Sequence, residues 1–128
     1  MEEHSLFERV EKQEQVAKNF GFYWQNLSQL CQQIISECAE VQEAVDNENP
    51  VHVVEEVGDL IHATLSLSFF CGVNGYEALS KSIEKFQKRY DALVELAQDE
   101  GNANLHEQPF EVLMRYWQLA KKKTQSNV

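Results

Sequence analysis

Two pairs of acidic residues in the first half of the chain have a spacing that suits metal binding or acid–base chemistry. Glu37 and Glu40 stand three residues apart, and so do Glu56 and Asp59. Residues three apart share one face of a helix, so both carboxylates of a pair can reach the same point. Carboxylates without a matching set of His or Cys ligands favour Mg²⁺, with Mn²⁺ as an alternative. The same spacing also occurs on solvated acidic helices, so a metal site and a plain acidic surface both stay open.

The surroundings of these pairs favour a metal site over a plain acidic surface. Glu37 lies between Ile34 and Val41 at helical spacing, at the edge of an apolar face. Carboxylates crowded beside apolar side chains lose hydration and repel one another, which a bound cation would offset. Gly58 lies inside the second pair, although a glycine within a helix costs about 1 kcal/mol relative to alanine. We expect a backbone or a ligand to approach closely there.

A histidine near the second pair raises a different metal chemistry. His62 follows Asp59 by three residues. Ferritin-like di-iron bundles place a Glu-x-x-His pair on each of two helices. This chain has one Asp-x-x-His and no second copy of it. A di-iron carboxylate bundle is therefore a weaker alternative than a magnesium site.

The elements that must position these residues are helices. Five Gly and two Pro in 128 residues leave few turn signals, and apolar residues recur at spacings of three and four. The pattern predicts helices at about 6–20, 23–46, 51–71, 76–99 and 110–123. Short connections between them predict an all-α antiparallel four-helix-type bundle with an additional C-terminal helix. We expect a single domain, 1–128, with a disordered tail at 124–128.

The second and third helices carry the clearest apolar seams. These seams are expected to face inward in the bundle. On the second helix the seam consists of Leu27, Cys31, Ile34, Cys38, Val41 and Val45, and on the third of Val54, Val57, Ile61, Thr64, Leu65 and Ser68.

Composition limits the partners of the chain. A formal net charge of −10 disfavours nucleic acid polymers and anionic membranes as partners. The longest apolar stretch, at about 65–73, is too short to span a bilayer, and the first residues lack the basic start of a signal peptide. The three cysteines have no disulfide or zinc spacing, which is typical of a reducing compartment. We therefore expect a cytoplasmic protein.

Taken in order, these segments resemble the MazG-type nucleotide pyrophosphohydrolases of the all-α NTP pyrophosphatase group. The family pattern is Glu-Glu-x-x-Glu, a gap and then Glu-x-x-Asp. Here Ser36 stands in place of the first Glu, and the other four acidic positions match. Downstream, Lys85 and Arg89 resemble the family's Lys-x-x-x-Arg segment, and Trp117 and Lys121 resemble its C-terminal Trp-x-x-Ala-Lys segment. The resemblance covers about residues 34–123.

The resemblance implies a Mg²⁺-dependent enzyme that converts a nucleoside triphosphate and water into the monophosphate and pyrophosphate. It implies that Glu37, Glu40, Glu56 and Asp59 hold the metal, with Glu37 also accepting the proton of the attacking water. It further implies a homodimer or homotetramer.

The same resemblance suggests roles for the cations and for one tryptophan. Lys85 and Arg89 would grip the phosphates, Trp117 would stack on the base, and Lys121 would reach a phosphate or the ribose. From the residues alone, Lys85 and Arg89 fit a surface pair better than a binding site, whereas Trp117 fits a core position and Lys121 a basic helix end about as well as they fit a site.

Two departures from the family pattern bear on function. Ser36 removes a carboxylate, which favours a non-catalytic helical interaction module of the same fold as the main alternative. The Cys-Pro-Trp-Asp segment that precedes the motif in some members is missing here, and Trp24 is expected to pack rather than replace its tryptophan. The sequence does not name the base or sugar that the enzyme would prefer.

Overall fold

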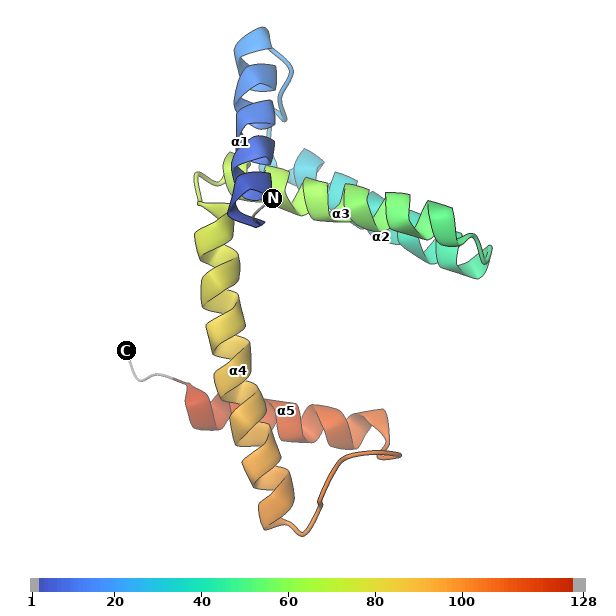
Figure 1. The fold of residues 1–128 in the computed structure, drawn as a ribbon, viewed down its shortest axis with the longest axis vertical. Helices are drawn as coiled ribbons and strands as arrows, with labels where there is room; N and C mark the ends of the chain where they lie inside the picture. Colours follow the sequence, from blue (N-terminus) through green and yellow to red (C-terminus); the bar gives the residue numbers. More distant parts are fainter. Residues whose placement is uncertain (1–2, 126–128) are drawn as a thin grey trace. The chain divides into compact units, whose positions relative to one another are not determined.

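The computed structural model describes residues 3–125, with side chains from residue 6 onward, and that range is helical without strands (Figure 1). The helices are α1 (Glu3–Phe20), α2 (Leu27–Asp46), α3 (Pro50–Phe70), α4 (Gly75–Asp99) and α5 (Phe110–Thr124). The all-α prediction with five helices is confirmed. The chain divides between residues 78 and 79 into two compact units, and α4 begins in the first and continues in the second. None of the helices within residues 3–125 has the length and apolar character needed to cross a bilayer.

Asparagine side chains set where three of the helices begin. The side-chain oxygens of Asn26, Asn49 and Asn74 each accept a hydrogen bond from the backbone N–H three residues later, at 2.9, 3.2 and 2.9 Å. An N-cap of this kind satisfies a backbone donor that the first helical turn leaves unpaired. The cap at Asn26 explains why α2 begins at Leu27 and not near residue 23 as predicted. Pro50, one residue before the predicted start of this helix, is the first residue of α3.

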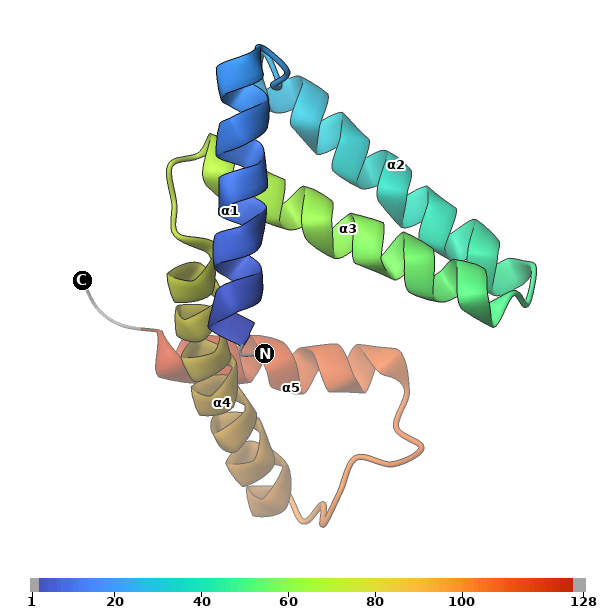
Figure 2. The ribbon, with the colours of Figure 1, turned by 45° about the horizontal axis from the view of Figure 1, so that its top comes forward.

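The first unit is built on a helical hairpin. The helices α2 and α3 lie side by side and antiparallel, and α1 packs across α3 (Figures 1 and 2). Leu30 is completely buried in this unit. The start of α4 lies close to α3. A Cβ added to Gly75 would lie only 3.0 Å from the Ser68 Oγ, so glycine permits this close approach. Phe7 also packs edge-on against Tyr76, with ring centroids 5.7 Å apart.

The hairpin leaves much of its apolar surface uncovered. Val45, Val54 and Ile61, which were predicted to face inward, are 53%, 74% and 56% exposed. That prediction is wrong for the single chain, because two helices cover each other along only one line of contact. Gly58 lies on the same uncovered side of α3 as Val54 and Ile61, and a Cβ at this position would meet no atom within 4 Å. The expected close approach at Gly58 is therefore not made by the chain itself.

In the second unit, α5 lies across the C-terminal half of α4 (Figure 1). The ring of Trp117 packs against Phe86 with centroids 5.5 Å apart, and Lys123 pairs with Glu95 at 3.4 Å. Small side chains allow the close packing, and they include the buried Ala92, Ala97 and Ala120.

The end of α5 corrects one prediction about the tail. Thr124 was expected to be disordered, but it is the last residue of α5. Its hydroxyl donates a hydrogen bond to the backbone carbonyl of Ala120 at 2.8 Å. Gln125 caps the helix with its backbone N–H 3.4 Å from the Lys122 carbonyl oxygen, and residues 126–128 of the predicted tail lie outside the described residues.

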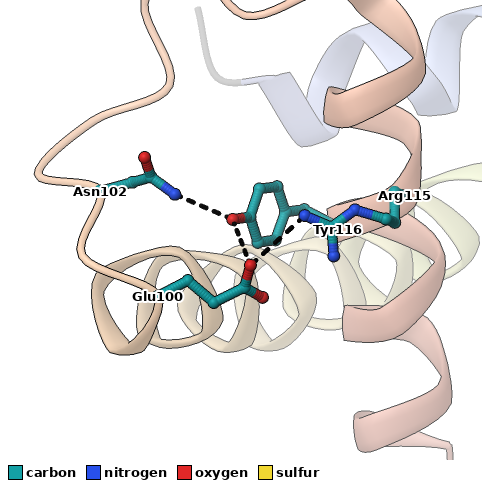
Figure 3. A network of polar contacts seen from close by, with 4 residues as sticks. All are labelled: Glu100, Asn102, Arg115 and Tyr116. Atoms are coloured by element: carbon teal, nitrogen blue, oxygen red, sulfur yellow. Dashed lines mark hydrogen bonds and ion pairs between the residues drawn. The ribbon is translucent and has the colours of Figure 1, made fainter.

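A polar network joins the end of α4 to α5 (Figure 3). Tyr116 is only 1% exposed. Its hydroxyl donates a hydrogen bond to the Glu100 carboxylate at 3.1 Å and accepts one from the Asn102 amide at 2.9 Å. The Arg115 guanidinium donates to the same Glu100 carboxylate at 3.4 Å and lies 4.5 Å from the Tyr116 ring centre. The buried hydroxyl thus has both a donor and an acceptor, and it fixes the loop after Gly101 to α5.

We expect Tyr116→Phe to destabilise the protein by about 1–2 kcal/mol, because it leaves Asn102 and Glu100 without their shared partner. Urea unfolding followed by circular dichroism measures this change. The matched control is Tyr90→Phe, which removes a hydroxyl from a residue of the same unit that is about half exposed. Equal stability of the two variants would contradict a structural role for the network.

Candidate functional site

The hairpin of α2 and α3 brings three of the four predicted carboxylates together. One carboxylate oxygen each of Glu37, Glu56 and Asp59 lies within 4.8 Å of the other two. Glu37 comes from the middle of α2 and the other two from the first half of α3. The short turn at 47–49 makes the two helices antiparallel neighbours, so residues about 20 apart in sequence meet at the same level. The i, i+3 spacing of Glu56 and Asp59 then points both toward Glu37.

Two oxygens of this acidic cluster are buried without a hydrogen-bond partner. They are the Oε2 atoms of Glu37 and Glu56. The side chain of Glu56 is 15% exposed, and its other oxygen lies 3.6 Å from the Nε2 of His52. The other oxygen of Glu37 accepts a 2.7 Å hydrogen bond from the Gln33 amide. Buried carboxylate oxygens without a partner are costly, and a cation between them would supply the missing interaction.

The electrostatics of Glu37 reflect the same crowding. Burial raises the pKa of the Glu37 carboxyl, and the carboxyl groups of Glu40 and Asp59 raise it further, whereas the hydrogen bond from Gln33 lowers it. A raised pKa means that the anion is disfavoured at this position unless a positive charge is added. Glu40 lies one turn further along α2, and it contacts Glu37 without joining the three-oxygen group.

The donor set of the cluster fits a hard divalent cation. Three carboxylates supply only oxygen, which is the ligand chemistry of Mg²⁺ and Mn²⁺. Among the described residues, no histidine belongs to the group. His62, on which the di-iron alternative depended, makes a 3.2 Å hydrogen bond with Gln13 of α1 instead. Ser36, which departs from the family pattern, is exposed and lies outside the group.

A pocket of about 550 Å³ borders the acidic cluster within the first unit. We call it the aromatic pocket. Its residues come from α1, from the segment between α1 and α2, and from α2 and α3: they are Gln13, Glu14, Ala17, Phe22, Tyr23, Trp24, Leu30, Gln33, Glu37, Asp59, His62, Ala63 and Ser66. Its volume is typical of small-molecule sites, and two carboxylates of the cluster form part of its wall.

The aromatic pocket was not predicted, although the sequence contains a signal for it. Trp24 was expected to pack, and it is indeed half buried, but it also lines the pocket together with Phe22 and Tyr23. Three consecutive aromatic residues follow Gly21, whose φ of +102° ends α1. Large aromatic side chains in a short connecting segment between helices are a sign of a binding surface.

The predicted phosphate-binding residues lie in the second unit. Lys85, Arg89 and Lys121 line a pocket of about 790 Å³, which we call the basic pocket. Seven of the chain's 11 Lys and Arg residues line it: Lys81, Lys85, Lys88, Arg89, Arg115, Lys121 and Lys122. The basic residues of a protein with net charge −10 are therefore concentrated where an anion could bind.

Trp117, the residue predicted to stack on a base, lies beside Arg89 in the second unit. It does not line the basic pocket. Its ring packs against Phe86, and the Arg89 guanidinium lies 5.9 Å from its ring centre. A cation over an indole face is favourable and holds the guanidinium in place. In this arrangement Trp117 supports Arg89.

Known proteins with similar sequences are named as one class of enzyme, the nucleoside triphosphate pyrophosphohydrolases. The curated relatives include the nucleoside triphosphate pyrophosphohydrolase/pyrophosphatase MazG of Thermotoga maritima, which is 36% identical over 105 residues. That alignment covers 82% of this chain and 40% of the relative. The nucleoside triphosphate pyrophosphohydrolase of Escherichia coli K12 is 29% identical over 119 residues, covering 89% of this chain and 44% of the relative. The chain thus spans less than half the length of these relatives.

The family comparison covers the acidic cluster itself. The model of the MazG nucleotide pyrophosphohydrolase domain matches residues 25–94. This range includes all of α2 and α3, with Glu37, Glu56 and Asp59, and the part of α4 that carries Lys85 and Arg89. Since more than half of the chain is matched, it belongs to the MazG nucleotide pyrophosphohydrolase domain family.

Proposed function

We propose that this protein is a Mg²⁺-dependent hydrolase that converts nucleoside triphosphates, ribo or deoxyribo, into the monophosphate and pyrophosphate. The observation that carries the proposal is the pair of buried carboxylate oxygens without partners inside the family's acidic motif. The names of the relatives from Thermotoga maritima and Escherichia coli support the same reaction. Such a reaction would remove surplus or damaged nucleotides from the cellular pool.

In the proposed reaction, water attacks the α-phosphorus and forms a new P–O bond. The bond from the α-phosphorus to the oxygen bridging it to the β-phosphorus breaks, and pyrophosphate leaves with that oxygen. Glu37, Glu56 and Asp59 would hold Mg²⁺, with Glu40 next to them. The bound cation would offset the charge that develops on the phosphate oxygens. Glu37, oriented by the hydrogen bond from Gln33, would accept the proton of the attacking water.

We further propose that the basic pocket binds phosphate groups through Lys85, Arg89 and Lys121. Arginine binds phosphate through two parallel hydrogen bonds, and lysine binds it as a point charge. The contact with Trp117 supports this role for Arg89, because a guanidinium that is already held loses less freedom on binding.

Since the family match crosses the boundary between the units, we propose that residues 1–128 form one MazG-like domain. The three free cysteines fit a cytoplasmic location.

We also propose that two copies of the chain associate through the uncovered faces of their hairpins. The exposed residues Val45, Val54 and Ile61 belong to the seams that the sequence predicts for a four-helix bundle. One hairpin supplies two helices, so two hairpins complete such a bundle and bury the apolar side chains. The open space around Gly58 would admit the backbone of a neighbouring helix. A tetramer could form from two such dimers.

The reaction is tested by product analysis. The protein is incubated with a panel of canonical and modified NTPs and dNTPs, with Mg²⁺ or with EDTA. Nucleotides are separated by chromatography, and pyrophosphate is detected separately from phosphate. We expect monophosphate and pyrophosphate, formed only with the metal. Diphosphate and phosphate would contradict attack at the α-phosphorus, and no turnover would favour a non-catalytic module.

The metal site is tested with Glu56→Gln. Removal of this charge relieves repulsion in the cluster, so we expect the variant to be more stable than the wild type in EDTA, by about 1 kcal/mol. We also expect its Mn²⁺ affinity, measured by calorimetry, to fall at least about tenfold, and its turnover to be lost.

The matched control for this test is Glu55→Gln, which removes the same charge from the neighbouring side chain that is 64% exposed. This variant should keep wild-type affinity and turnover. A folded Glu56→Gln protein that binds Mn²⁺ as tightly as the control would rule out the proposed metal site.

The dimer is tested with Val54→Asp, which places a charge on the uncovered face of α3. Because Val54 is exposed in the single chain, we expect the helices to persist while the dimer dissociates. Light scattering after size-exclusion chromatography gives the mass, and circular dichroism gives the helix content. Val16→Asp, a similarly exposed position on α1, should leave the mass unchanged. A wild-type monomer would refute the proposed association.

A further inference from the structure

The aromatic pocket has a polar wall that the proposed metal chemistry does not use. Glu14 of α1 and Ser66 of α3 both line it, 52 residues apart in sequence. Ser66 is a buried polar residue of the first unit, and its hydroxyl donates a hydrogen bond to one oxygen of the Glu14 carboxylate. Glu14 is itself half buried. A carboxylate held by a buried hydroxyl at the edge of a pocket has a fixed position from which it can bind a ligand.

The second oxygen of Glu14 is available to a ligand. Among the described residues, no hydrogen bond or ion pair engages it. An ionised carboxylate only accepts hydrogen bonds, so it suits a ligand edge that presents N–H groups. The neighbouring pocket residues Phe22, Tyr23 and Trp24 offer flat apolar surfaces on which a ring can stack. These two features together describe a site for a planar heterocycle that carries N–H donors.

Position and size connect this heterocycle to the proposed substrate. Glu37 and Asp59 of the acidic cluster also line the aromatic pocket. A volume of about 550 Å³ is ample for a nucleoside. A nucleotide with its phosphates at the cluster would therefore have its base within this same pocket. This step rests on the proposed function, because it assumes that the cluster acts on a nucleotide.

We propose that Glu14 is a specificity-determining residue that selects guanine bases. Guanine presents two adjacent donors, the ring N1–H and the 2-amino group, which match the two oxygens of one carboxylate, because the oxygen that accepts from Ser66 keeps a second lone pair. Such paired bonds to an ionised acceptor are among the strongest hydrogen bonds in proteins.

The other bases match Glu14 less well. Adenine and cytosine place a ring nitrogen acceptor beside their amino group, so its lone pair would face the carboxylate. Uracil and thymine carry a single ring N–H between two carbonyl oxygens. The negative carboxylate repels both of these oxygens. The expected order of preference is therefore guanine, then adenine and cytosine, then uracil and thymine.

The test compares nucleotides that differ at this edge. For the wild type we expect kcat/KM to be about tenfold or more higher for GTP than for ITP, which lacks only the 2-amino group, and higher still than for UTP. The variant Glu14→Gln keeps an acceptor for Ser66 but offers an amide N–H where the carboxylate offered an oxygen. We expect its preference for GTP over UTP to fall by about tenfold to a hundredfold, because GTP loses a paired contact that UTP does not make.

The matched control is Glu11→Gln, which removes the same charge from an exposed position of α1 outside this pocket. It should keep the wild-type ratio of GTP to UTP turnover. Thermal unfolding of both variants checks that α1 remains packed. Equal turnover of GTP, ITP and UTP by the wild type, or a preference for GTP that survives Glu14→Gln, would overturn the proposal.

A second measurement keeps this inference separate from the proposed reaction. Calorimetry with GMP and UMP in EDTA measures recognition of the base without turnover. We expect tighter binding of GMP by the wild type and a loss of that difference in Glu14→Gln. If no triphosphate is hydrolysed while this pattern holds, the proposed reaction fails and the assignment of Glu14 stands. If triphosphates are hydrolysed and GMP and UMP bind alike, only the assignment of Glu14 fails.

Discussion

The crowding of carboxylates between α2 and α3 is the constraint on which the rest of the site depends. Two antiparallel helices joined by a short turn bring Glu37 opposite Glu56 and Asp59, and two of the oxygens are buried there without partners. A fold does not gain stability from such a group by itself, since like charges repel more strongly where water is excluded. The cluster is therefore best explained by a ligand whose charge it complements.

The two units carry different side chains that the proposed hydrolysis of a polyphosphate would require. The first unit contains the carboxylates and a pocket with aromatic walls, and the second contains the cations. Seven basic residues around one pocket balance part of the charge of an otherwise acidic protein and provide a local positive potential for an anion. The Glu100, Tyr116 and Arg115 network supports this second unit, because it fixes the loop after α4 to the helix that carries Lys121.

Local rules predicted the helices and most of the acidic cluster. Asparagine caps and glycines act within a few residues, so the helix ends could be predicted to within about four positions, with the largest error at the start of α2. The spacing of Glu56 and Asp59 sufficed to place them on one face of α3. The exposure of Val54 and Ile61 could not be predicted in the same way, because an apolar stripe does not say whether its cover comes from the same chain. The contact between Glu14 and Ser66 joins residues 52 apart, and no periodic pattern carries that information.

The small core of the single chain has a thermodynamic consequence. Within the described residues the fully buried apolar side chains are few and mostly small, with Leu30 and Tyr116 the largest of them. The heat capacity change of unfolding scales with the apolar surface that folding removes from water. We therefore expect a lone chain to have a small heat capacity change of unfolding and a shallow dependence of stability on temperature. Burial of the hairpin faces in the proposed dimer would add apolar surface, so assembly would increase the heat capacity change and the curvature of stability with temperature.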